Sequence, residues 1–193
     1  MTSCCVSRTL LESFRLFFAF AALALAVVPL FIPVFTAPDD LTGVNASSNS
    51  TKGKITLWEE RFWVPGVDHE ELVKVELVDY FTCNNGRRRI QITEGIAIVA
   101  CVVTGLNFVM CIFSFFAGRL LYFALAIYFP LAVGASATVF ALLLEWFYGG
   151  WCESQPPLSE RSGVHWKYDV GWFLLVVSTG FSLLGLISTF IIR

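Results

Sequence analysis

Residues of the types that catalyse reactions or bind metals are few and scattered in this sequence of 193 residues. The two histidines, His69 and His165, stand in no metal-ligand spacing with each other or with the cysteines. A nucleophile elbow, a phosphate-binding glycine loop and a Cys–His pairing are missing from the sequence. Two acidic pairs lie in a polar segment, where surface charge explains them better than a catalytic dyad: Glu59-Glu60 and Glu70-Glu71. We therefore expect neither enzymatic activity nor a metal or other cofactor.

Four long apolar runs divide the chain and determine where its polar segments lie: Leu16–Pro38, Gly95–Gly118, Leu120–Leu144 and Val170–Ile192. Each is long enough for a transmembrane helix, which needs ~20 apolar residues to cross ~30 Å of hydrocarbon. A composition of 56% hydrophobic and 15% charged residues also indicates an integral membrane protein. The sequence predicts an all-α four-helix transmembrane bundle with a small antiparallel β-sheet ectodomain.

The first apolar run has a second interpretation. Arg8 and Arg15, followed by apolar residues and Ala24-Leu25-Ala26, are also typical of a secretory signal with a small-residue cleavage site. The run continues to Phe35, well beyond a usual signal core. We therefore favour an uncleaved first helix over a signal peptide.

Hydrophilic residues are distributed unevenly between the four runs. Residues 39–94 and 145–169 form two long loops, whereas only Arg119 separates the second and third spans. An even number of spans places residues 1–15 and Arg193 on one side of the membrane and both long loops on the other. The basic flank of the first helix favours cytoplasmic termini, although Arg87-Arg88-Arg89 before the second span argue against this orientation.

Two glycosylation sequons support an extracellular position for the long loops. Asn45-Ala46-Ser47 and Asn49-Ser50-Thr51 lie in residues 39–52, a Gly/Ser/Asn-rich stretch that we expect to be a flexible linker. N-linked glycans are added only to chains that enter the secretory pathway. We predict glycosylation at Asn45 and Asn49.

The cysteines give a second argument for the same orientation. Cys83 and Cys152 lie one in each long loop, each near a membrane boundary, which predicts a disulfide formed in an oxidising compartment. Cys101 and Cys111 lie inside the second span. Cys4 and Cys5 lie beside the first span and are either palmitoylation sites or free thiols. We predict a multi-pass plasma-membrane protein with both termini cytoplasmic.

Strand-like patterns occur in both long loops. Ile55–Trp58 and Arg61–Val64 are rich in β-branched and aromatic residues, and Glu71–Cys83 alternates apolar with polar side chains. Asn84-Asn85-Gly86 then predicts a turn. In the second loop, Val164–Tyr168 predicts an edge strand.

The membrane spans themselves contain little that is polar. Asn107 is the one strongly polar side chain in mid-span, and we expect it to form an interhelical hydrogen bond worth ~1 kcal/mol. Small residues at helical spacing, Ala19, Ala22 and Ala26 among them, predict close helix packing. Six aromatic residues predict an interfacial belt, with a partner-binding patch as the alternative: Trp146, Tyr148, Trp151, Trp166, Tyr168 and Trp172.

The run Lys54–Val64 resembles the outer-loop signature of amastins, the surface glycoproteins of kinetoplastid parasites, whose layout is similar to that of claudin-like tetraspans. The signature runs approximately Cys-x-Thr/Ser-Leu-Trp-Gly-x-basic-x-x-Cys, and four residues match it: Thr56, Leu57, Trp58 and Arg61. Lys54 and Val64 replace its two cysteines, and Glu59 replaces its glycine.

Two further stretches also resemble amastins. Arg87–Gln91, leading into Ile96–Ile98, is similar to the amastin entry into the second span, and Val170–Leu175 is similar to the fourth span. Without the signature cysteines, the resemblance implies a divergent member in which Cys83–Cys152 takes the place of the family's loop disulfide. It also implies a role at the parasite surface.

These patterns together predict a non-enzymatic tetraspan glycoprotein that contacts a neighbouring protein or an apposed host membrane. The alternative is an auxiliary channel subunit or a claudin-like paracellular pore former. A row of acidic residues on one strand face would favour this alternative.

Expected partners are membrane lipids, further copies of the chain or other membrane proteins. A net charge of −2 and scattered basic residues exclude nucleic acid.

Overall fold

The computed structural model describes residues 2–37, 52–65, 70–117, 120–153, 155–160 and 166–191, and of residues 2–8, 52, 62–65, 70–71, 117 and 120 the backbone only. The chain divides into two compact units. We call the first the helical unit: residues 1–28, 96–139 and 174–193. We call the second the sheet unit: residues 29–95 and 140–173.

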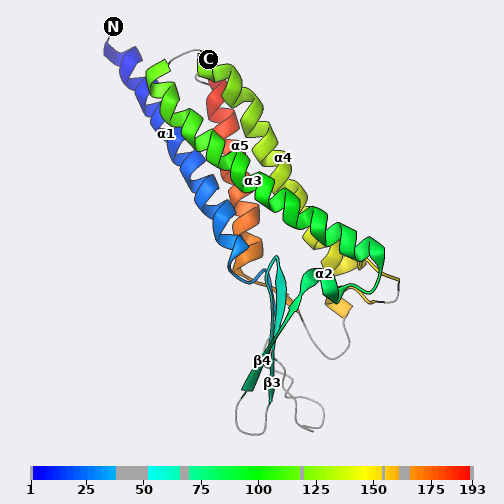
Figure 1. Cartoon of the computed structure of the whole chain (residues 1–193). Helices are drawn as coiled ribbons and strands as arrows, with labels where there is room; N and C mark the ends of the chain where they lie inside the picture. Colours follow the sequence, from blue (N-terminus) through cyan, green and yellow to red (C-terminus); the bar gives the residue numbers. More distant parts are fainter. Residues whose placement is uncertain are drawn as a thin grey trace. The chain divides into compact units, whose positions relative to one another are not determined.

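Four long helices account for most of the described chain (Figure 1): α1 Thr2–Val27, α3 Asn84–Ala117, α4 Leu120–Gly149 and α5 Val170–Ile191. Each contains a segment long and apolar enough to cross a membrane. Together with the small antiparallel sheet, they confirm the predicted fold class.

The first helix ends earlier than the apolar run from which it was predicted. α1 stops at Val27, a 3-10 turn follows at Val28–Leu30, and strand β1 occupies Phe35–Ala37. Pro29 and Pro33 account for this change, since proline lacks the N–H that a helix interior needs and restricts the residue before it. The last part of the run is therefore a strand of the sheet unit.

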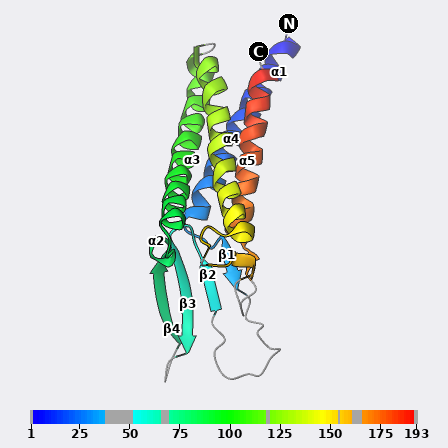
Figure 2. The same ribbon diagram turned by 90° about the vertical axis from the view of Figure 1, so that its right-hand side faces the viewer.

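The sheet has five antiparallel strands in the order β4-β3-β2-β1-β5 (Figure 2). The other strands are β2 Lys52–Ile55, β3 Glu59–Pro65, β4 Glu70–Glu76 and β5 Lys167–Tyr168. The predicted strand Arg61–Val64 lies within β3, and β5 forms one edge of the sheet.

Two predicted strands and one predicted turn in the first long loop were wrong in part. The predicted strand Ile55–Trp58 is a strand only at Ile55, after which the chain turns into β3. The predicted strand Glu71–Cys83 ends at Glu76, where the short helix α2 (Leu77–Tyr80) begins, and the predicted turn at residues 84–86 is the first turn of α3. Leu77 is fully buried, so packing in the sheet unit outweighs the local strand pattern.

The helical unit is packed through small residues. Ala19, Ala22 and Ala26 are all buried on one face of α1, and the Ser178 hydroxyl of α5 donates a 2.8 Å hydrogen bond to the Ala22 carbonyl. Gly185 of α5 lies against the ring of Phe129, where any Cβ would overlap it. Close backbone approach of this kind is how helices associate where lipid supplies no hydrophobic drive.

Candidate functional site

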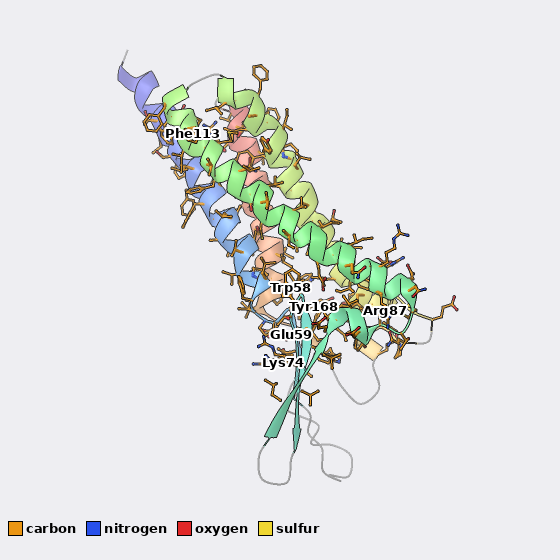
Figure 3. All side chains as sticks on the ribbon, viewed as in Figure 1. Trp58, Glu59, Lys74, Arg87, Phe113 and Tyr168 are labelled. Carbon is orange, nitrogen blue, oxygen red and sulfur yellow. A yellow bond between two sulfur atoms is a disulfide. The ribbon has the colours of Figure 1, made fainter. Side chains whose placement is uncertain are left out.

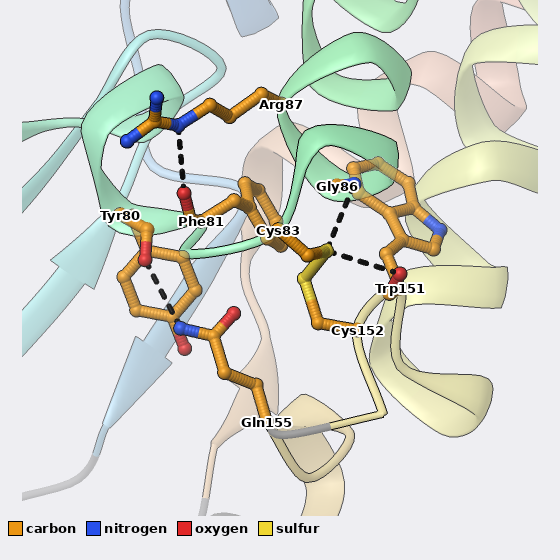
Figure 4. The surroundings of a disulfide bond; sticks show 8 residues. All are labelled: Tyr80, Phe81, Cys83, Gly86, Arg87, Trp151, Cys152 and Gln155. Atoms are coloured by element: carbon orange, nitrogen blue, oxygen red, sulfur yellow. Dashed lines mark hydrogen bonds between the residues drawn. A yellow bond between two sulfur atoms is a disulfide. The ribbon is translucent and has the colours of Figure 1, made fainter.

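A disulfide between Cys83 and Cys152 cross-links the sheet unit (Figure 4). The Cα atoms of the two cysteines are 5.9 Å apart. Cys83 lies between α2 and α3, and Cys152 lies just after α4. This is the pair that the sequence analysis named. The bond joins two segments that are 69 residues apart in the chain.

The disulfide lies in a tightly packed environment. Phe81, 1% exposed, has its ring centre 5.4 Å from each of the Trp146 and Trp151 rings. The Gly86 amide donates a 3.2 Å hydrogen bond to the Cys83 sulfur, and Gln155 donates one of 3.1 Å to the Tyr80 carbonyl. These contacts hold α2 and the start of α3 against the segment after α4, and Figure 4 draws the two hydrogen bonds.

Three of the six aromatic residues assigned to an interfacial belt are buried in the sheet unit instead. Trp146, Trp151 and Trp166 are 2%, 4% and 5% exposed, so the belt prediction is wrong for these three. Phe35 of β1 packs against Trp146, and Phe147 stacks on Tyr168 at 4.5 Å. Sequence alone could not distinguish the two environments, because tryptophan suits both a membrane interface and a packed core.

The packing around Tyr168 changes the pKa of its phenol. Burial, with a further contribution from the neighbouring Tyr148, raises the pKa of the Tyr168 phenol above its usual value. The phenol of Tyr168 therefore loses its proton only at a higher pH than an ordinary tyrosine does.

The residues of the amastin-like signature form the corner between β2 and β3. The Thr56 hydroxyl accepts hydrogen bonds from the amides of Trp58 and Glu59, at 3.3 and 3.1 Å. The Trp58 indole donates a 2.7 Å hydrogen bond to the Leu30 carbonyl, and Leu57 is fully buried. Arg61 forms an ion pair with Glu59. The signature therefore fixes this corner to the segment that follows α1.

Two arginines of the triplet Arg87-Arg88-Arg89, before the second span, make contacts that the sequence did not predict. Arg89 forms an ion pair with Glu145 near the end of α4. Arg87 donates a 2.9 Å hydrogen bond from its Nε to the Phe81 carbonyl, whereas Arg88 is exposed. Two of the three charges that argued against the orientation are thus used to hold the sheet unit together.

Arg15, which the sequence analysis placed in the basic flank of the first helix, is buried in the helical unit at 3% exposure. Its guanidinium donates a 2.6 Å hydrogen bond to the Ser114 hydroxyl, which in turn donates one of 2.7 Å to the Cys111 carbonyl. The signal was present in the sequence, because Arg15 precedes Ala19 by four residues and so shares the buried face of α1.

Other predicted site residues stay untested. Asn107 is 2% exposed, and its Oδ1 accepts no hydrogen bond within the described part of the chain, so its interhelical bond remains a prediction. The glycosylation sites Asn45 and Asn49 lie outside the described residues. Among the residues that the structure describes, no group of His, Cys, Asp or Glu side chains is arranged to hold a metal.

A comparison with protein families decides which family this is. The model for amastin surface glycoproteins matches residues 17–188, which include the whole sheet unit, the second and third spans and most of the first and fourth. The chain belongs to the amastin family. A search of the curated proteins finds no match.

Membership confirms the resemblance carried by Thr56, Leu57, Trp58 and Arg61. It makes the chain a multi-pass surface tetraspan protein, in a family of surface glycoproteins and not of known enzymes. Within the family, this amastin carries its described disulfide between Cys83 and Cys152, and a lysine and a valine at the signature's two cysteine positions.

Proposed function

We propose that this amastin is a contact protein whose sheet unit faces the outside of the cell and meets a neighbouring protein or an apposed host membrane. Both termini would be cytoplasmic, the membrane would be the plasma membrane, and Asn45 and Asn49 would carry glycans. The protein would act by binding, without catalysing a reaction.

The observation that supports this proposal best is the disulfide-linked sheet itself. Four strands from the two long loops and β1 from the end of the first apolar run form one folded unit, joined at Cys83–Cys152. Structural disulfides persist in oxidising surroundings such as the cell surface. The strands also present a polar face with several exposed charges, which is a surface suited to specific contacts.

The competing function, an auxiliary channel subunit or a paracellular pore former, lacks a comparable observation. Its expected mark was a row of acidic residues on one strand face. The described polar face instead sets Arg61 opposite Lys74 and Lys54 opposite Arg61, while Glu59 and Glu76 form only one acidic pair. We therefore keep the contact function.

Cell adhesion tests the proposal directly. Cells that display the full chain should bind a monolayer of host cells more strongly than cells without it. A double variant, Cys83→Ser with Cys152→Ser, should lose most of this gain because the two segments of the sheet unit separate. Cys101→Ser is the matched control, since it removes a cysteine of the helical unit that forms no disulfide.

Binding must be compared at equal amounts of protein on the surface, measured by surface biotinylation. Equal adhesion of cells with and without the wild-type chain would contradict the contact function. Full adhesion by the double cysteine variant would show that the folded sheet unit is not the contacting part.

A further inference from the structure

One line of side chains crosses the entire sheet on its polar face. The register pairs Lys74 with Arg61, Arg61 with Lys54, Lys54 with Thr36, and Thr36 with Lys167. Directly opposed residues on neighbouring antiparallel strands project from the same face. We call Lys74, Arg61, Lys54 and Lys167 the basic row, with the Thr36 hydroxyl between the last two.

The basic row is accessible. Lys54, Lys74 and Lys167 are exposed, and Arg61 is partly exposed. Figure 3 labels Lys74 on β4 and Glu59 on β3, the strands where the row begins. With strands about 4.8 Å apart, four steps across the sheet give the row a length of about 19 Å.

This arrangement costs stability. Like charges directly opposite each other on neighbouring strands destabilise a sheet. The row contains two such pairs, Arg61 with Lys74 and Lys54 with Arg61. The ion pair between Arg61 and Glu59 offsets part of the repulsion.

Protection against edge-to-edge aggregation explains only part of the row. Lysines on edge strands discourage pairing with other chains, which would account for Lys74 on β4 and Lys167 on β5. Lys54 and Arg61 lie on the inner strands β2 and β3, where no edge needs protection. A chain with a net charge of −2 nevertheless aligns basic residues here.

The row is narrow as well as long. Glu59 and Glu76 lie opposite each other on the same face, two residues along β3 and β4 from Arg61 and Lys74. Their carboxylates would repel a broad anionic surface that covered the face. A thin anionic chain lying across the strands would follow the lysines and avoid these carboxylates.

We propose that the basic row is a binding site for a linear sulfated polysaccharide. Lysine ammonium groups bind sulfate as point charges, and the Thr36 hydroxyl donates a hydrogen bond where the row lacks a cation. The site rests on the proposed contact function and gives the contacted surface a chemical class. Because the attraction is electrostatic, binding weakens as salt concentration rises.

Heparin serves as the probe. The full chain is reconstituted in nanodiscs of phosphatidylcholine, which carries no net charge, and binding to immobilised heparin is measured over a series of salt concentrations. We expect Lys74→Gln and Lys167→Gln each to weaken binding several-fold and to lower the slope of log affinity against log salt by about one. Lys74→Arg keeps the charge and should retain binding.

Two further variants make the test specific. Arg88→Gln removes one exposed positive charge that lies on α3 and not on a strand, and it should leave binding unchanged. Glu76→Gln removes a carboxylate beside the row and should strengthen binding. An equal loss with Arg88→Gln and Lys74→Gln would overturn the site, because net charge alone would then explain the attraction.

The remaining outcomes separate this site from other partners and from the proposed function. No salt-dependent binding of heparin would overturn it, as would lysine-dependent binding to phosphatidylserine vesicles in place of heparin. If the double variant, Lys74→Gln with Lys167→Gln, still adheres, the polysaccharide site is overturned and the contact function remains supported. If the wild type does not adhere but still binds heparin through the basic row, only the contact function is contradicted.

Discussion

At the scale of single residues, Gly86 determines how closely the start of α3 approaches the disulfide. A Cβ at this position would lie 2.5 Å from the Phe81 ring and 2.9 Å from the Cys152 sulfur. Neither neighbour can move easily, since Phe81 is buried among tryptophans and Cys152 is covalently held. Glycine is therefore required here by space, although alanine is the better helix former.

We expect Gly86→Ala to lower the free energy of unfolding by ~1–3 kcal/mol, because overpacking a rigid site forces its neighbours apart. The matched control is Gly95→Ala on the same helix, where a Cβ meets nothing within 4 Å. That variant should be neutral or more stable by up to ~1 kcal/mol. Thermal unfolding of the purified variants in one detergent measures both, and equal stabilities would contradict the packing described around the disulfide.

Residues also show how far sequence reasoning reaches. Cys83 and Cys152 could be paired from the sequence, because topology left one cysteine in each long loop. The burial of Arg15 was missed because a charge beside an apolar run is normally a flanking charge, although its four-residue spacing from Ala19 places it on the buried face of α1. The basic row could not be recognised at all, since it exists only once the strand register is known.

At the scale of elements, the N-terminus of α5 is held by the segment that leads into β1. Gly171 donates a 3.0 Å hydrogen bond to the Pro33 carbonyl, and Asp169 donates one of 2.8 Å to the Val34 carbonyl. Helices with clear apolar runs could be predicted from the sequence. The end of α1 and the change from β4 to α2 could not, because tertiary contacts outweigh local pattern there.

Two glycines on α5 test this connection. A Cβ on Gly171 would lie 2.5 Å from the Pro33 carbonyl oxygen, whereas one on Gly180 would meet nothing within 4 Å. We expect Gly171→Ala to lower the free energy of unfolding by ~1–3 kcal/mol by breaking the 3.0 Å hydrogen bond and displacing the backbone. Gly180→Ala should be tolerated. If denaturation curves place Gly171→Ala at wild-type stability, the described junction between α5 and β1 is wrong.

At the scale of the whole molecule, the chain combines a helical unit packed through small residues with a disulfide-linked sheet unit. The number of spans, the sheet and the family were accessible from the sequence, because apolar runs and a short signature are local properties. Which residues of the sheet face a partner was not accessible, since that depends on pairing between strands far apart in the chain. The contact function depends on the sheet unit lying outside the cell.

Lysine labelling on intact cells tests that claim most directly. All four lysines of the chain, Lys52, Lys54, Lys74 and Lys167, lie in the two long loops. A membrane-impermeant amine reagent, followed by peptide mapping, should therefore modify Lys74 and Lys167 on intact cells as strongly as after permeabilisation. Modification of these two lysines only after permeabilisation would place the sheet unit in the cytoplasm and contradict the account.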